Sequence, residues 1–156
     1  MSKLIRAGVL TGVTDGLFSS VLSVVFYGST ITRLFQGVAA TLLGSAAFEG
    51  GSRTAGIGVA MHFGVAFAWS AVFLSILAFA PRLRRAIAAP AGVAATAAWY
   101  GPAIWLVMSL AVIPLLLQRP PSISLRWWVQ LIGHFPFVGV PIVASCPSGT
   151  RPLTQR

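Results

Sequence analysis

Long apolar segments separated by short polar ones dominate the chain, and four of them are long enough to cross a bilayer. They cover residues 7–27, 54–79, 91–117 and 125–144. A membrane-spanning helix needs about 20 apolar residues at a rise of 1.5 Å per residue. Residues 54–79 hold no charged side chain between Arg53 and the cluster Arg82, Arg84 and Arg85. The pattern predicts an all-α integral membrane protein with four transmembrane helices.

A fifth segment, residues 31–48, has a different pattern. Its apolar residues recur at the i, i+3, i+4 and i+7 spacing of one helical face, at Ile31, Leu34, Phe35, Val38 and Leu42. Polar residues fall mostly on the other side of that helix. This pattern is typical of an interfacial or re-entrant helix, here capped by Thr30. The alternative is a fifth span.

The positions of the basic residues favour four spans. With the N-terminus inside, the inner side holds seven basic residues: Lys3, Arg6, Arg82, Arg84, Arg85, Arg151 and Arg156. The outer side then holds four: Arg33, Arg53, Arg119 and Arg126. A fifth span would change this division to five against six, which fits the positive-inside tendency less well. We therefore expect a bacterial cytoplasmic membrane protein with both termini in the cytoplasm, residues 147–156 forming a polar tail.

Composition agrees with a lipid environment. The 156 residues are 56% hydrophobic and 8% charged, whereas soluble domains carry about 25% charged residues. The net charge of +9 does not indicate nucleic-acid binding, because the basic residues stand at the ends of apolar segments. The single cysteine, Cys146, excludes an internal disulfide and a cysteine-only metal site.

Three polar residues inside the apolar segments are the candidate intramembrane site. In the four-span arrangement His62 lies about 12 Å and His134 about 13 Å below the outer surface, and Asp15 lies near the same level. Ionisable side chains at such depth are costly and face protein. Three interpretations stay open: a structural polar network, a proton or ion pathway, and metal or haem ligation, because two histidines and a carboxylate resemble a divalent-metal set.

Glycines beside Asp15 predict close helix packing. Gly8, Gly12 and Gly16 recur every four residues and so share one helical face, which lets a neighbouring backbone approach closely. Asp15 is therefore expected to face the bundle interior, against the second or fourth span. The expected partners are His62, His134, Ser70 and Tyr100.

Prolines break the regular hydrogen bonding of the third span. Pro102 and Pro114 lack an N–H and leave the carbonyls of Ala98 and Leu110 without their helical partners. The indole of Trp99 and the hydroxyl of Tyr100 are nearby donors. In the fourth span, Arg126, Trp127 and Trp128 are typical of an interfacial anchor.

The order of these residues loosely resembles the YagU-like bacterial inner-membrane proteins over about residues 55–142. The residues that carry the resemblance are His62 with Ala66-Phe67, Pro81 and its basic turn, Gly92, Pro120-Pro121, Trp127-Trp128 and Gly133-His134. The first third of the chain departs from that pattern. The resemblance implies a small bacterial multi-span protein and carries over no functional residues.

Motifs for enzymatic chemistry are absent from the sequence. It has no glycine-rich phosphate loop, no Cys-x-x-Cys and no His-Glu-x-x-His. We therefore expect no enzymatic activity and no cofactor. The expected role is a structural or accessory subunit whose partners are the lipid bilayer and other membrane subunits or a second copy. The alternative is a small transporter or channel that uses Asp15, His62 and His134.

Overall fold

Five long helical runs account for most of residues 2–146, the part of the chain that the computed structural model describes. No strand occurs within these residues, so the prediction of an all-helical fold is confirmed. Each run is long and apolar enough to cross a membrane: Lys3–Phe26, Ile31–Phe48, Gly51–Phe79, Pro90–Leu117 and Leu125–Ala144. The predicted tail at residues 147–156 lies outside the described residues.

Most of these runs contain more than one type of helix. In chain order the elements are α1 (Lys3–Val21), η1 (Leu22–Phe26), α2 (Ile31–Leu43), η2 (Gly44–Phe48), α3 (Gly51–Phe79), α4 (Pro81–Ala86), α5 (Pro90–Val107), η3 (Met108–Val112), α6 (Ile113–Leu117), α7 (Leu125–His134), η4 (Phe135–Gly139) and α8 (Val140–Ala144). The segments η1, η3 and η4 are π-helical turns, and η2 is a 3₁₀ helix.

Two of the π-helical turns stand beside prolines. The turn η3 precedes Pro114, and the N–H of Ile113 donates across it to the carbonyl of Met108, five residues back. The turn η4 contains Pro136 and precedes Pro141. Because proline has no N–H to donate, the carbonyl four residues earlier loses its partner, and a local widening of the helix accommodates the break.

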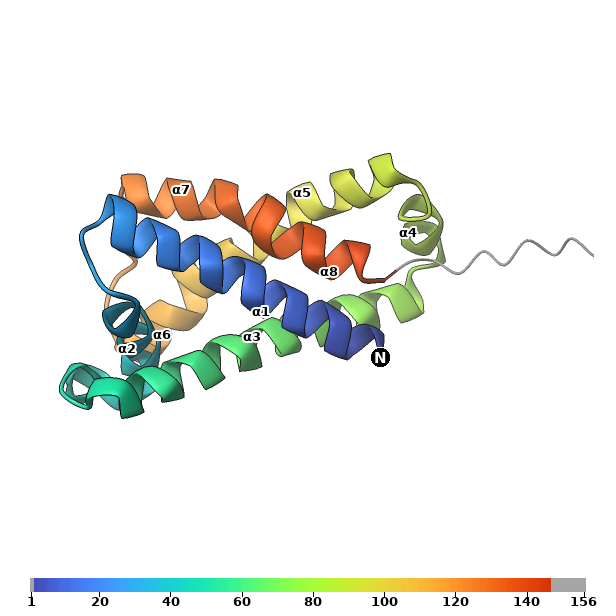
Figure 1. Ribbon diagram of the computed structural model, residues 1–156. Coiled ribbons are helices and arrows are strands. Elements are labelled where there is room, and N and C mark those ends of the chain that lie inside the picture. Colours follow the sequence, from blue (N-terminus) through green and yellow to red (C-terminus); the bar gives the residue numbers. More distant parts are fainter. Residues whose placement is uncertain (1, 147–156) are drawn as a thin grey trace, which may run out of the picture.

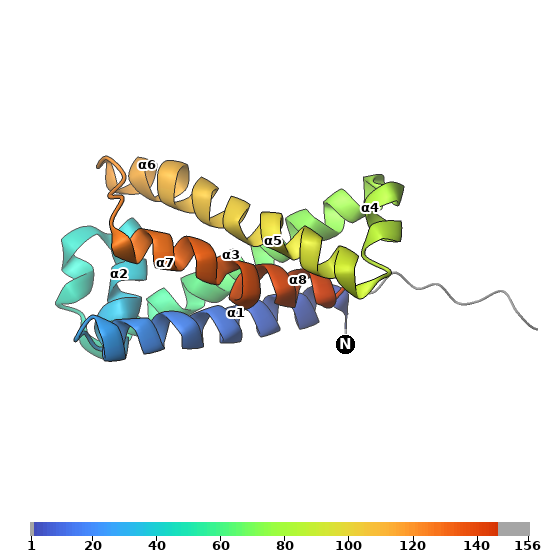
Figure 2. The ribbon, with the colours of Figure 1, turned by 90° about the horizontal axis from the view of Figure 1, so that it is seen from above.

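The long helices run side by side, and α2 lies across one end of them. In Figure 1, α1, α3, α5 and the α7–α8 run extend along the length of the molecule, whereas α2 is seen nearly end-on. Figure 2, turned by 90°, shows α2 running across the end of the bundle. Helix α2 packs mainly against α3, while α1 packs against α3, α8 and η4.

The ends of α2 follow from local chemistry. The Thr30 side chain accepts a hydrogen bond from the Arg33 N–H at 3.1 Å and caps the first turn. Gly44 ends the helix with φ of 65°, a backbone conformation that side chains disfavour. The helix therefore begins at the predicted residue, but α2 ends five residues before the predicted limit, and the 3₁₀ helix η2 continues to Phe48. Its placement in a membrane interface stays a prediction, since the run Ile31–Phe48 also meets the length and composition of a span.

The best-packed region lies where α3, α5 and α8 meet. Its buried side chains include Phe73, Leu77, Tyr100, Ile104 and Ile142. Elsewhere the helices expose apolar surface: in an apolar stretch of 18 residues, 17–22% of the residues are buried in each of the first four runs, against 44% in Leu125–Ala144. Water would solvate this exposed surface poorly, so the fold needs an apolar environment or apolar partners around it.

Candidate functional site

The glycine stripe of α1 lies directly against α3. A Cβ atom added to Gly8 would overlap the ring of Phe67, and one added to Gly12 would overlap the ring of Phe63. At Gly16 an added Cβ would stand 3.4 Å from Nε2 of His62. The absence of side chains at these positions therefore allows large rings of α3 to reach the α1 backbone. This close approach brings His62 beside Asp15.

His62 is held by the α1 backbone and faces Asp15. Its Nε2 lies 3.0 Å from the carbonyl oxygen of Gly12. Because a carbonyl only accepts hydrogen bonds, Nε2 carries the proton and donates it. The other ring nitrogen, Nδ1, lies 3.9 Å from Oδ2 of Asp15. The helix backbone thus fixes which ring nitrogen is directed at the carboxyl group.

The pair of Asp15 and His62 is largely enclosed by the apolar helices of the bundle. The two side chains are only 17% and 15% exposed. The second carboxyl oxygen of Asp15, Oδ1, is buried and has no hydrogen-bond partner within residues 2–146. The site therefore retains one unused acceptor position.

His134 lies near this pair without touching it. It is buried in α7, where its Nδ1 donates to the Gln130 carbonyl at 2.7 Å, and its ring packs against Trp105 with centroids 4.8 Å apart. Between His134 and Asp15 or His62, the described chain has no hydrogen bond or ion pair. The structure thus brings two of the three candidates into contact.

The donor set for a metal ion is incomplete. Within residues 2–146 no three His, Cys, Asp or Glu side chains lie close enough together to hold one. His134 is directed at its own helix, so Asp15 and His62 would supply two ligands at most. A tightly held divalent ion takes four or more ligands, of which the protein usually supplies at least three. The geometry counts against the metal-site interpretation.

The other expected partners of Asp15 and of the freed carbonyls form different contacts. Ser70 donates to the Ala66 carbonyl of its own helix at 2.8 Å. The hydroxyl of Tyr100 donates at 2.8 Å to the carbonyl of Trp69 in α3, and not to Asp15 or to the Ala98 carbonyl. Trp99 is 53% exposed, and its ring lies edge-on to that of Tyr100 with centroids 5.8 Å apart. Of the partners expected for Asp15, His62 alone is in contact with it.

A further polar contact, between Thr14 and Phe137, was missed by the sequence analysis. The Thr14 hydroxyl lies 2.6 Å from the Phe137 carbonyl oxygen and 2.8 Å from that of Leu10. Phe137 stands four residues before Pro141, so its carbonyl has no N–H from the next helical turn. Thr14 supplies the missing donor from another helix. The position of Pro141 indicated that a donor was needed, but not which helix would provide it.

We expect Thr14→Val to destabilise the protein by about 1 kcal/mol, because an isosteric side chain removes the donor to Phe137 and keeps the volume. Thr14→Ser keeps the hydroxyl and serves as the control, with a smaller loss. Thermal unfolding in detergent, followed by circular dichroism, measures both variants. Equal melting of Thr14→Val and wild type would show that this hydrogen bond adds no stability.

Of the predicted interfacial anchor Arg126, Trp127 and Trp128, Trp127 departs from the expectation. Trp127 is buried and its indole donates to the Ser109 hydroxyl at 2.9 Å. Trp128 is 52% exposed. The guanidinium carbon of Arg126 lies 4.4 Å from the centre of the Tyr27 ring. Trp127 is thus a packing residue between α7 and η3, because one face of α7 must be covered by the preceding helix.

The chain was compared with known protein families, with curated proteins and with solved structures. None of the three comparisons gives a match. The resemblance of residues 55–142 to the YagU-like proteins is therefore neither supported nor contradicted and stays a prediction.

Proposed function

We propose that the chain is an integral membrane protein without enzymatic activity that serves as a structural or accessory subunit of a membrane complex. The observation that carries the proposal is that polar side chains inside the bundle join helices to one another. His62 connects α3 to the α1 backbone, Thr14 connects α1 to η4, and Tyr100 connects α5 to α3. In lipid, such contacts hold helices together where the hydrophobic effect cannot.

The distribution of charge supports a single orientation in a bacterial cytoplasmic membrane. The N-terminal residues Lys3 and Arg6 and the arginines of α4 belong to the same end of the bundle, where Figure 1 shows the N-terminus and α4. Helix α2, with Arg33, lies at the opposite end. We propose four spans with both termini in the cytoplasm, α2 lying in the opposite interface.

Cysteine labelling tests this topology. In a Cys146→Ala background, we expect Arg85→Cys to react with a membrane-impermeant maleimide only after the cells are opened, because α4 faces the cytoplasm. Gln118→Cys, in the turn after α6, is expected to react in intact cells. Labelling of Arg85→Cys from outside would contradict the proposed orientation. Release of the protein by alkaline carbonate would contradict membrane insertion itself.

A proton pathway is the second candidate function. It is favoured by the separation of 3.9 Å between Asp15 and His62 and by the unpartnered Oδ1 of Asp15. Proteoliposomes loaded with a pH-sensitive dye distinguish the two proposals. Proton flux that Asp15→Asn abolishes in a folded protein would support a pathway, whereas wild-type vesicles as tight as empty ones would support the structural role.

A further inference from the structure

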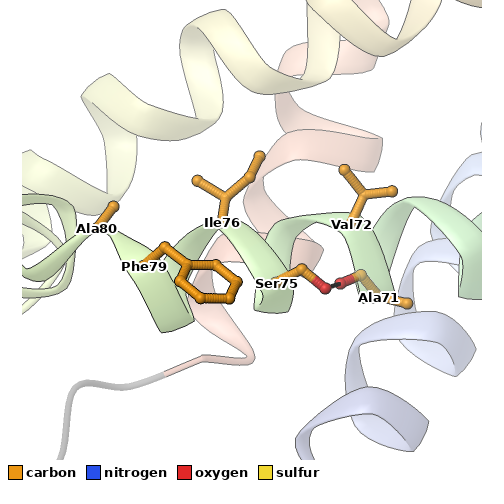
Figure 3. Close-up of a pocket in the computed structure, with 6 residues that line it drawn as sticks. All are labelled: Ala71, Val72, Ser75, Ile76, Phe79 and Ala80. Carbon is orange, nitrogen blue, oxygen red and sulfur yellow. Dashed lines mark hydrogen bonds between the residues drawn. The ribbon is translucent and has the colours of Figure 1, made fainter.

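An apolar groove follows the last three turns of α3. Figure 3 shows its lining, formed by Ala71, Val72, Ser75, Ile76, Phe79 and Ala80. The groove is shallow, because all of its lining residues belong to α3 and the residue that follows it, and its volume of about 630 Å³ is largely open to the outside. Its one polar side chain, Ser75, donates to the Ala71 carbonyl at 2.9 Å, so the hydroxyl is already satisfied. The groove therefore presents a surface suited to a hydrocarbon chain.

The length and position of the groove match one leaflet of a bilayer. From Ala71 to Ala80 the helix rises about 14 Å, and half of a hydrocarbon core is about 15 Å. At the end of α3 stands Phe79, which is 89% exposed. The basic helix α4 follows immediately, at Pro81–Ala86. A chain lying in the groove would thus lead to the arginines of α4.

The arginines of α4 have no acidic side chain near them. Arg82, Arg84 and Arg85 are all exposed. The sequence holds two acidic residues, Asp15 and Glu49. Asp15 contacts His62, about 25 Å along α3 from its end, and Glu49 precedes α3, about 40 Å away. The arginines of α4 therefore have no nearby acidic side chain to pair with, and their positive charge would attract an external anion.

A second, smaller cavity places basic side chains over apolar ones at the same end. It has a volume of about 170 Å³ and is lined by Arg84 and Lys3 together with Leu74, Leu77, Ala78, Ile87 and Cys146. Arg84 thus stands at a boundary between apolar surface and charge, on a different side of α3 from the groove, because Leu74, Leu77 and Ala78 alternate around the helix with the residues of the groove. Guanidinium groups bind phosphate oxygens through paired hydrogen bonds.

We propose that an anionic phospholipid binds here, with an acyl chain along the groove of α3 and its phosphate at the arginines of α4. The inference depends on the proposed membrane insertion and adds a specific ligand to it. Phosphatidylglycerol fits this site better than phosphatidylcholine, because the choline group would place positive charge beside three arginines.

Lipid titration of the purified full chain in detergent, followed by native mass spectrometry, tests the proposal. The probes are phosphatidylglycerol and phosphatidylcholine with the same acyl chains. We expect phosphatidylglycerol to bind at least about tenfold more tightly. The triple variant Arg82→Gln, Arg84→Gln and Arg85→Gln should lose this preference. The matched control Arg33→Gln, Arg53→Gln and Arg119→Gln removes the same charge at the other end and should keep it.

The groove is tested separately from the charge. Ser75→Trp leaves every arginine in place and fills the groove with an indole, so it should weaken phosphatidylglycerol binding at least about fivefold. Because these positions are exposed, thermal melts should show folded variants. Unchanged binding by Ser75→Trp, or equal competition by soluble glycerophosphoglycerol, would overturn the proposal in favour of general charge attraction.

Other outcomes would also overturn it. Equal binding of the two lipids would mean that the arginines select no headgroup. A wild-type dimer that Ser75→Trp dissociates would show that the groove receives a second copy of the chain. A protein that resists carbonate extraction but shows no lipid preference would overturn this inference alone, leaving the proposed membrane role intact.

Discussion

Replacing Gly101 with alanine is expected to lower the free energy of unfolding by about 3 kcal/mol. A Cβ atom at this position of α5 would overlap the His134 carbonyl group and stand 2.9 Å from the backbone nitrogen of Gly139. Gly139 meets α5 in the same way, since a Cβ there would overlap the Ala97 carbonyl oxygen. Because the opposing atoms are backbone atoms, they cannot rotate away, so the helices must separate.

A glycine with free space around it provides the control. Gly64 lies in the middle of α3, and an added Cβ there would meet no atom within 4 Å. We expect Gly64→Ala to leave stability unchanged or to raise it by up to about 1 kcal/mol, through better helix propensity. Thermal or denaturant unfolding in detergent compares the two variants. If Gly101→Ala unfolds like Gly64→Ala, the close contact between α5 and η4 does not exist in solution.

The Asp15 and His62 pair should give the second large effect. We expect Asp15→Leu and His62→Phe each to cost about 1–3 kcal/mol, because Asp15→Leu leaves Nδ1 of His62 without its polar neighbour and His62→Phe leaves the Asp15 carboxyl group without one. The double variant removes both polar groups, so its loss should be smaller than the sum by at least about 0.5 kcal/mol. Additive losses would contradict an energetic link between the two side chains.

Two carboxyl-to-amide changes separate the role of Asp15 from a general effect of charge. Asp15→Asn keeps an acceptor and adds donors for His62, so the fold should survive with a loss below about 1 kcal/mol. Glu49→Gln removes the exposed acid and should change nothing measurable. A wild-type melt for Asp15→Leu would show that Asp15 holds no helices together.

The helices were predicted well because hydrophobic length is a local property. The expected segment 54–79 corresponds to the observed run Gly51–Phe79, and the expected segment 91–117 corresponds to Pro90–Leu117. Residues 31–48 coincide with the run Ile31–Phe48. The π-helical turns were not anticipated, since a proline indicates a broken hydrogen bond without showing how the helix closes around it.

The candidate site was predicted only in part, because depth along a helix does not give direction around it. His62 and His134 have similar expected depths in the membrane. His62 nevertheless lies beside Asp15, whereas Nδ1 of His134 donates to the Gln130 carbonyl of its own helix. The approach of His62 depends on which side chains of α3 meet the glycines of α1. That pairing is a property of the tertiary structure, and the spacing of residues along a single sequence does not reveal it.

The contact between Thr14 and Phe137 has a consequence for how the molecule is assembled during synthesis. Residues 123 positions apart form this hydrogen bond, so α1 emerges from the ribosome long before its partner exists. Until then the Thr14 hydroxyl has the Leu10 carbonyl of its own helix as an acceptor. The run Leu125–Ala144 is the most enclosed of the five and the last of them to be made. The bundle is therefore complete only once this run packs between α1 and α5. Until then the earlier helices are more loosely associated with one another.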